Sequence, residues 1–253
     1  MNHLSSFFPD PRGRRLRYQY WEPGAKAYSR VALLLHGPAR HSGSYPRLLP
    51  PLLGAGFKVY ALDFAGFGAS PGERGAGGLL AMADAVEALC RRIESAELGR
   101  EIGIVAHSMG AVAALLFLKR YPSRRAGLAA LSPLLFGAQA EAGPAAAELS
   151  GSALPPALAE ELGRVAGELL AEPSFLEGRS AAFLVGEEDP LVPRARLEAA
   201  VAALPLDPKR ILAFPGARHD LLGGEAAEEV AGALIAWFDE TKAERPAPER
   251  GLG

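Results

Sequence analysis

A serine stands where an apolar run changes abruptly into a helix-forming run. Residues 104–107 read Ile-Val-Ala-His, Ser108 follows, and the segment 109–118 is rich in Ala and Leu. A strand that turns sharply into a helix with a serine at the corner has the geometry of a nucleophile elbow, in which the turn exposes the hydroxyl. The flanking residues must be small, which Gly110 satisfies fully and Ala106 less well. The alternative is an ordinary serine that caps a helix N-terminus.

A serine hydroxyl is a weak nucleophile and needs a histidine base that is held by a carboxylate. The expected chain order is serine, acid, histidine. Asp189 follows the apolar run 183–185, and His219 follows the next apolar run at 211–214. Taken singly, Asp189 is typical of a turn or helix cap and His219 of a loop. Together with Ser108, each at the end of a predicted strand, they predict a Ser-His-Asp triad.

Other polar residues receive no catalytic role from this pattern. Asp220 is expected to point away from its neighbour His219 on an extended chain. Of the remaining histidines, His3 precedes the predicted domain, and three lie in predicted loops: His36, His41 and His107.

The elements that must position the triad form a regular series. Short apolar runs alternate with longer helix-like segments, which predicts an α/β protein with a mostly parallel central sheet and helices on both faces. The predicted strands are 18–21, which alternates like an edge strand, 31–35, 59–62, 102–106, 128–131, 181–185 and 211–214. The predicted helices are 45–55, 79–95, the segment after the elbow up to 121, 194–203 and 225–241.

One stretch, 133–179, lacks strand signals and interrupts this series. Its apolar residues at 158, 162, 165 and 169 recur at helical spacing. Either its helices pack on the core as surface helices, or they form a lid inserted over the site. We expect a helical lid at 133–179 between two core segments, 1–132 and 180–242, and a disordered Pro- and charge-rich tail at 243–253.

The predicted lid is the natural source of substrate contacts, because substrate choice resides in such insertions and loops. An apolar lid would also suit a homodimer. Four of its apolar residues are candidates for the lining of a substrate pocket: Phe136, Leu154, Leu158 and Phe175.

Composition limits the class of partner and the compartment. The formal net charge of −2 argues against nucleic acid, which requires a basic face. The single cysteine, Cys90, excludes an intramolecular disulfide, fits a core position in a helix, and is typical of a reducing, cytoplasmic compartment. The N-terminal arginines precede no apolar core of signal length, and no apolar run is long enough to span a bilayer. We therefore expect no stable membrane insertion.

Several motifs resemble the α/β-hydrolase superfamily, and within it the monoacylglycerol lipase and lysophospholipase group. Residues 36–45, His-Gly-Pro-Ala-Arg-His-Ser-Gly-Ser-Tyr, resemble that group's H-G-x-x-x-H-S-x-x-Y segment. Residues 63–70, Asp-Phe-Ala-Gly-Phe-Gly-Ala-Ser, resemble its D-x-x-G-x-G-x-S loop. The elbow at 107–110, Asp189 and His219 match its triad positions. The resemblance covers most of residues 15–241 and little of the predicted lid.

This resemblance implies the α/β-hydrolase fold and a serine carboxylic-ester hydrolase that acts through an acyl-enzyme. Its substrates would be monoacylglycerols, lysophospholipids or similar single-chain esters, and neither a metal nor a cofactor is implied. Two alternatives stay open: a related serine hydrolase for small esters, thioesters or peptides, and a degenerate hydrolase that acts as a ligand-binding protein.

The oxyanion hole departs from the family pattern. One donor is expected from the N–H of Met109, the residue after the nucleophile. The second normally comes from the residue after His-Gly, which here is Pro38, and proline has no N–H. The loss of one such donor typically costs on the order of 3 kcal/mol of transition-state stabilisation. Either Ala39 or a side chain supplies a substitute, or the enzyme is slow, or the site binds without turnover.

Overall fold

The computed structural model of the 253-residue chain describes residues 1–24, 27–38, 40–124, 126–136 and 154–243. The strands are β1 (Asn2–Pro9), β2 (Arg15–Glu22), β3 (Arg30–Leu35), β4 (Phe57–Leu62), β5 (Ile102–His107), β6 (Gly127–Leu131), β7 (Ala181–Gly186) and β8 (Lys209–Phe214). The helices are α1 (Leu49–Gly54), α2 (Gly78–Ala96), α3 (Met109–Arg120), α5 (Pro156–Ala171), α6 (Arg194–Ala202) and α7 (Ala227–Ala243), with a 3-10 turn at Pro173–Leu176.

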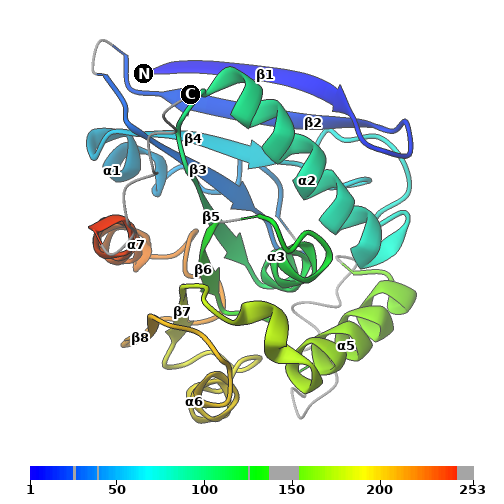
Figure 1. Cartoon of the computed structure of the whole chain (residues 1–253), viewed down its shortest axis with the longest axis vertical. Helices are drawn as coiled ribbons and strands as arrows, with labels where there is room; N and C mark the ends of the chain where they lie inside the picture. The colour runs from blue at the N-terminus through cyan, green and yellow to red at the C-terminus, as the bar shows by residue number, and fades with distance from the viewer. Residues whose placement is uncertain (25–26, 39, 125, 137–153, 244–253) are drawn as a thin grey trace, which may run out of the picture.

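All the described strands belong to one twisted sheet, in the order β1-β2-β4-β3-β5-β6-β7-β8 (Figure 1). Strands β1 and β2 run antiparallel to their neighbours, and the pairs from β4 to β8 are parallel. This arrangement confirms the predicted α/β class with a mostly parallel sheet. It also places the carboxyl ends of β3, β5, β6, β7 and β8 at one edge, where the predicted site residues follow.

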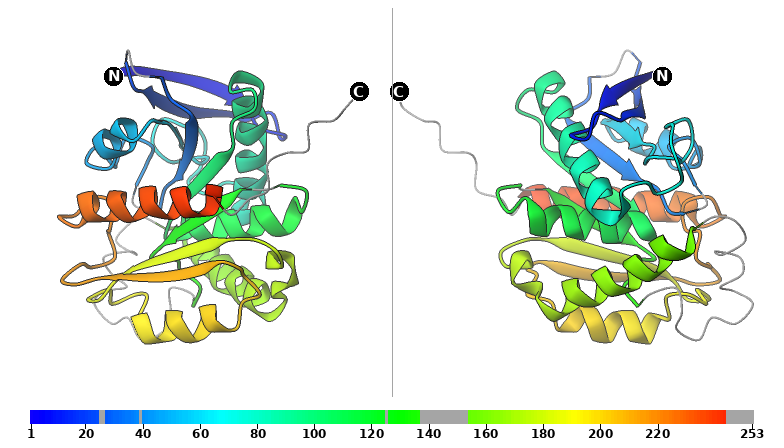
Figure 2. Two further views of the ribbon diagram at one scale, coloured as in Figure 1. Left: turned by 60° about the vertical axis from the view of Figure 1, so that its left-hand side comes forward. Right: turned by 90° about the vertical axis from the view of Figure 1, so that its right-hand side faces the viewer.

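Helices cover both faces of the sheet, as predicted. Helices α2, α3 and α5 lie on one face, and α1 and α7 lie on the other (Figures 1 and 2). Each face has its own cluster of buried side chains: α2, α3, α5 and α6 contribute to one, α1 and α7 to the other. The central strands are buried on both sides, which explains why they appear in the sequence as continuous apolar runs.

The first strand is missing from the sequence prediction, which took 18–21 as the sheet edge. Strand β1 is the edge, and β2, which contains 18–21, pairs with both β1 and β4. Most β1 residues are exposed, so the segment lacks the apolar signal of a half-buried strand. His3 was expected to precede the domain, but it belongs to β1 and stacks on Trp21 with the ring centroids 5.0 Å apart.

The helix predicted at 45–55 is shorter than expected. Helix α1 begins only at Leu49, after turns in which the Ser44 N–H bonds the His41 carbonyl and the Leu48 N–H bonds the Tyr45 carbonyl. These turns carry the Tyr45 ring into the core, where it is 2% exposed. The segment 40–48 therefore forms a loop that the buried Tyr45 ring anchors to the core.

Helix α5 lies in the stretch predicted to be a lid, and its apolar stripe is buried. Leu158, Leu162, Val165 and Leu169 belong to the core cluster shared with α2 and α3. Helix α5 therefore packs on the core as a surface helix, which was one of the two arrangements expected for 133–179, the other being a lid over the site. Residues 137–153 and the tail from 244 lie outside the described residues, so the lid and the disordered tail stay predictions.

Two sequence expectations concern single features of the fold. Cys90 is buried in α2, which confirms its predicted core position. No helix in the described ranges has the length and apolar character needed to cross a membrane.

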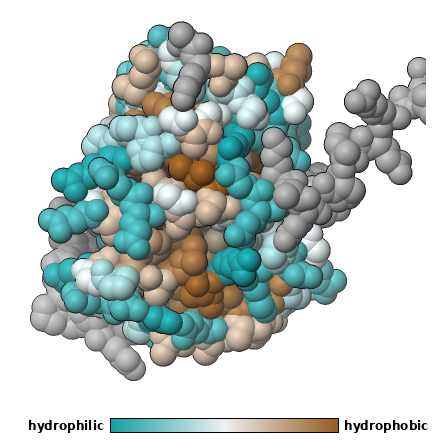
Figure 3. All heavy atoms as spheres, turned by 90° about the vertical axis from the view of Figure 1, so that its left-hand side faces the viewer, coloured by the Kyte–Doolittle hydropathy of each residue, from teal (hydrophilic) through white to brown (hydrophobic). Residues whose placement is uncertain are grey.

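On the side that carries α1 and α7, apolar residues gather in a strip down the middle of the surface, flanked by polar residues (Figure 3). The structure contains one chain, so the homodimer stays a prediction.

A buried ion cluster joins α2 to the antiparallel end of the sheet. Glu97, just after α2, accepts bonds from Lys58 Nζ at 2.7 Å, Tyr60 OH at 2.7 Å and Tyr28 OH at 2.9 Å. Lys58 also pairs with Glu22 at 3.1 Å. The Glu97 side chain is only 2% exposed, so its charge depends on these partners.

We expect Glu97→Gln to lower the free energy of unfolding by about 3 kcal/mol, because it leaves Lys58 buried with a single carboxylate partner. Glu94→Gln is the matched control, since Glu94 lies one turn away in α2 and makes a surface pair with Arg124. Its loss should stay below about 1 kcal/mol. Urea unfolding at neutral pH measures both, and equal losses would contradict a structural role for the cluster.

Candidate active site

Ser108 occupies the sharp turn between β5 and α3. Its φ of 57° and ψ of −117° lie in a region that non-glycine residues rarely adopt, which is the strained geometry expected of a nucleophile elbow. The turn is held because the Ser108 N–H donates to the Leu131 carbonyl at 2.8 Å. A Cβ at Gly110 would lie 2.6 Å from the Leu35 carbonyl oxygen, so the small residue predicted there is a steric necessity.

The three residues of the predicted triad meet at the carboxyl edge of the sheet. His219 Nε2 lies 2.9 Å from Ser108 Oγ, and His219 Nδ1 lies 2.9 Å from Asp189 Oδ2 and 3.1 Å from Asp189 Oδ1. Ser108 follows β5, Asp189 follows β7 and His219 follows β8. With Nδ1 protonated and directed at the carboxylate, Nε2 is free to accept the serine proton, which is the tautomer that a general base requires.

The Asp189 carboxylate is fixed from both sides. Oδ1 accepts the N–H groups of Leu191 at 2.9 Å and Val192 at 3.0 Å, which belong to the turn that starts at Asp189. Burial alone would raise its pKa, but the hydrogen bond and charge of His219 and the Leu191 N–H outweigh burial, and the pKa lies below its ordinary value. Asp189 is therefore a carboxylate at neutral pH, and it can stabilise an imidazolium.

His107 is a second histidine that supports the site, and the sequence analysis gave it only a loop position. It ends β5, and its Nε2–H donates to the backbone carbonyl of His219 at 3.0 Å. Burial and the neighbouring His219 together lower its pKa to about 4, so the ring is neutral. Its Nδ1 faces Tyr45 OH at 3.4 Å. These contacts link the loop of the predicted base to the loop after β3.

The loop after β3 lies against the elbow. A Cβ at Gly37 would be 3.1 Å from Ser108 Cβ and 3.1 Å from His107 Nδ1, so a larger residue here would push on both side chains, and glycine lets the backbone approach the serine without that displacement. Pro38 follows, at the position that the family resemblance assigns to the second oxyanion donor, and it is buried and lines a pocket together with Ser108. Ala39, the proposed substitute, lies outside the described residues. Met109 opens α3, so its N–H belongs to the unpaired first turn of the helix.

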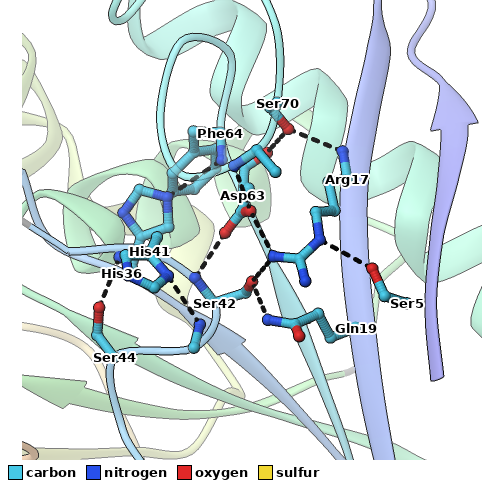
Figure 4. A network of polar contacts seen from close by, with 12 residues as sticks. Ser5, Arg17, Gln19, His36, His41, Ser42, Ser44, Asp63, Phe64 and Ser70 are labelled. Atoms are coloured by element: carbon cyan, nitrogen blue, oxygen red, sulfur yellow. Dashed lines mark hydrogen bonds and ion pairs between the residues drawn. The ribbon is translucent and has the colours of Figure 1, made fainter. Parts of the chain in front are cut away.

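A polar network fixes this loop to the one after β4 (Figure 4). Asp63 accepts the Ser42 N–H at 2.6 Å and the Ala69 N–H at 3.0 Å, and Arg17 pairs with it at 3.2 Å. Burial would raise the pKa of Asp63, but these backbone N–H groups outweigh it and the pKa is lowered. The two motifs that carried the family resemblance are thus bonded to each other, a pairing that sequence spacing alone did not reveal.

His36 adds a second clamp to the same pair of loops. Its Nδ1–H donates to the Gly37 carbonyl at 2.8 Å, and its Nε2 accepts the Phe64 N–H at 3.1 Å. Burial lowers its pKa to about 4, so the ring stays neutral and can accept that bond. His36 therefore ties the loop after β3 to the loop after β4 through both of its ring nitrogens.

A pocket of about 330 Å³ opens above the serine. Its lining combines Ser108 and His219 of the triad with apolar and charged side chains. The lining residues are Gly37, Pro38, Arg40, His107, Ser108, Pro190, Leu191, Arg218, His219 and Asp220. Arg40 and Asp220 form an ion pair, so Asp220 has a partner that the sequence analysis did not identify. A pocket lined in this way can hold an uncharged carbonyl group close to Ser108, with apolar side chains on one part of the lining and polar side chains on another.

The four apolar residues proposed for an acyl channel lie in or against the core. Leu154 and Leu158 are buried, and Phe136 and Phe175 pack on the same cluster, with the Arg196 guanidinium 4.4 Å from the centre of the Phe136 ring. Between Leu154 and Phe136 the chain lies outside the described residues, so this channel stays a prediction. Within the described ranges there is no cluster of three or more candidate metal ligands.

A protein-family model supports the resemblance found in the sequence. The model described as "Hydrolase_4: Serine aminopeptidase, S33" matches residues 27–175. Human monoglyceride lipase is 30% identical over 129 residues, which are 49% of this chain and 41% of the human protein. The chain thus spans less than half the length of this relative.

Solved structures confirm the α/β-hydrolase fold. Monoacylglycerol lipase from Paleococcus ferrophilus is similar with a TM-score of 0.69 at 23% identity, covering 95% of this chain and 99% of that one. A soluble variant of monoglyceride lipase from Saccharomyces cerevisiae, in complex with a substrate analogue, is similar with a TM-score of 0.75 at 17% identity, covering 93% and 94%.

The buried histidines make the stability of the site dependent on pH. The pKa of His36 falls from 6.5 to about 4 on folding. Between these two pH values the unfolded chain binds a proton at His36 and the folded chain does not. The free energy of unfolding therefore decreases as the pH falls from about 6.5 to 4, and His36 accounts for on the order of 3 kcal/mol of this decrease. His107, with its pKa also near 4, adds a similar loss.

We expect His36→Gln to remove its share of this loss, so that the free energy of unfolding declines less steeply between pH 6.5 and 4. The measurement is urea unfolding across that range, with His41→Gln as the control at an exposed histidine of the same loop. If the decline were equally steep in both variants, the buried neutral state of His36 would be wrong.

Proposed function

Because the chain belongs to the serine aminopeptidase S33 family (Hydrolase_4), we propose that it is a serine hydrolase that cleaves carboxylic esters through an acyl-enzyme. The observation that supports this most strongly is the position of the His219 ring, 2.9 Å from Ser108 Oγ on one side and 2.9 Å from Asp189 Oδ2 on the other. In this proposal Ser108 is the nucleophile, His219 the general base and Asp189 its orienting carboxylate.

The acylation half begins with proton transfer. His219 Nε2 accepts the hydroxyl proton as Ser108 Oγ forms a bond to the carbonyl carbon, and the electron pair of the carbonyl moves onto oxygen. Asp189 stabilises the imidazolium. The Met109 N–H stabilises the oxyanion, together with a second donor in place of the missing N–H of Pro38. When the carbonyl re-forms, the bond to the alkoxy oxygen breaks and His219 gives that oxygen its proton.

The deacylation half repeats these steps with water as the nucleophile. His219 takes a proton from water as its oxygen attacks the acyl carbon, and the second tetrahedral intermediate expels Ser108 Oγ. The proton returns from His219 to the serine, and the fatty acid leaves. Every proton moves through the same Nε2 atom, so the reaction requires no metal or redox cofactor.

We propose single-chain esters as substrates, monoacylglycerols or lysophospholipids in particular. The likeness to human monoglyceride lipase supports this class, as do the apolar Pro38, Pro190 and Leu191 of the pocket lining. The lid predicted at 133–179 would extend this lining. With one cysteine in the chain, we place the activity in the cytoplasm.

A second candidate is a degenerate hydrolase that binds a ligand without turnover, and Pro38 is the observation that favours it. Loss of an oxyanion donor lowers the rate and leaves the pocket intact. Turnover separates the two candidates, because a binding protein would hydrolyse no ester above the uncatalysed rate.

We expect Ser108→Ala to lower kcat for p-nitrophenyl butyrate by at least about a thousandfold, since the Ser108 hydroxyl supplies the oxygen of the proposed acyl-enzyme. The release of p-nitrophenol measures this directly. Ser123→Ala, at an exposed serine after α3, is the control and should keep parental activity. Equal turnover by Ser108→Ala and the parent would exclude Ser108 as the nucleophile.

For acyl chain length, we expect kcat/KM to rise from acetyl to at least octanoyl esters of p-nitrophenol, because each buried CH₂ contributes up to about 0.8 kcal/mol of binding. A series of esters at fixed enzyme concentration gives the profile. A maximum at acetate would contradict single-chain lipids as the substrate class and favour small esters.

A further inference from the structure

The loop after β3, which begins at Gly37, would supply the second hydrogen-bond donor of the oxyanion hole, but its backbone offers no N–H at the expected position, Pro38. Pro38 has no N–H, the Gly37 N–H faces Tyr45 OH at 3.4 Å, and the Arg40 N–H donates to the Gly37 carbonyl at 3.2 Å. The described backbone of this loop therefore directs no unpaired N–H at the pocket. A second donor must come from Ala39 or from a side chain.

Arg40 is the side chain of this loop that lines the pocket together with Ser108. Its guanidinium is paired with Asp220, and this contact uses one terminal nitrogen. Among the described residues the guanidinium has no other hydrogen-bond partner, so Nε and the second terminal nitrogen keep their N–H groups available. The Arg40 side chain is 40% exposed, which leaves it reachable from the pocket.

We propose that Arg40 replaces the missing backbone N–H of Pro38 and donates a hydrogen bond to the carbonyl oxygen as it becomes negative. This inference rests on the proposed function. A guanidinium is suited to the role because its donors are planar and permanently charged, and a charge-assisted bond to an oxyanion is about twice as strong as a neutral one. Charge develops on that oxygen only in the transition state, so the contact lowers the barrier more than it tightens substrate binding.

Asp220 is a positioning residue in this account. Its Oδ2 holds Arg40, while its Oδ1 accepts the Gly223 N–H at 3.0 Å, so the carboxylate is anchored in the loop that carries His219. The ion pair thus connects the proposed oxyanion donor to the loop of the base. It also offsets the arginine charge in the resting site, which limits any repulsion of the imidazolium that forms on His219.

The first test removes the donor. We expect Arg40→Gln to lower kcat for p-nitrophenyl butyrate about a hundredfold with KM changed less than about threefold, the effect of losing one oxyanion-hole donor. Arg47→Gln removes the same charge from an exposed residue of the same segment, outside the pocket lining, and should keep parental kcat. Parental kcat in Arg40→Gln would overturn the proposal.

The second test restores a backbone donor. Pro38→Ala returns an N–H to the usual position, so we expect it to recover at least tenfold in kcat when combined with Arg40→Gln, and to raise the parent by less than that factor. A merely structural arginine would not be rescued in this way. A loss in Arg40→Gln that Pro38→Ala leaves unrepaired would therefore overturn the proposal as well.

Failure of this inference is distinct from failure of the proposed function. If the parent protein hydrolyses no ester and Ser108→Ala changes nothing, the hydrolase assignment itself is wrong. If Arg40→Gln proves unfolded by circular dichroism, Asp220→Asn takes its place, because it keeps the Arg40 guanidinium and removes the negative charge that holds it in place. We then expect about a tenfold lower kcat, again repaired by Pro38→Ala, and a parental kcat would overturn the role of Arg40.

Discussion

The tight turn at Ser108 is the constraint on which the rest of the site depends. Helix α3 begins so close to the end of β3 that a Cβ at Gly110 would lie 2.6 Å from the Leu35 carbonyl oxygen, and Ser108, at the turn between β5 and α3, adopts a φ of 57°. Such strain persists only where surrounding structure fixes it. Here the sheet supplies that support, because β5 is hydrogen-bonded between β3 and β6, and α3 packs in the larger core cluster.

Around this turn, buried neutral histidines connect the loops at the carboxyl edge of the sheet. His36 joins the loop after β3 to the loop after β4, and His107 joins β5 to the loop after β8. Asp63 fastens the first pair of loops again through Ser42 and Ala69. The proposed nucleophile, base and oxyanion donors therefore sit on separate segments whose relative positions are fixed by buried polar contacts, as a preorganised site requires.

The triad could be predicted from the sequence, since Ser108, Asp189 and His219 each follow an apolar run that forms a strand, and parallel strands bring their carboxyl ends to one edge of the sheet. Strand β1 could not, because most of its residues are exposed and show no apolar period. Nor could the start of α1 at Leu49, where turns rather than periodicity decide the boundary. The pairing of Arg40 with Asp220 joins residues 180 positions apart, and no local pattern links them.

Covalent labelling tests the central claim, that Ser108 is a nucleophile activated by His219, most directly. The purified protein is treated with a fluorophosphonate probe and mapped by peptide mass spectrometry, with His219→Ala treated in parallel. We predict a single adduct on Ser108 in the parent and a labelling rate lower by a factor of a hundred or more in His219→Ala. A folded parent that carries no adduct on Ser108, or equal labelling of both proteins, would contradict the account.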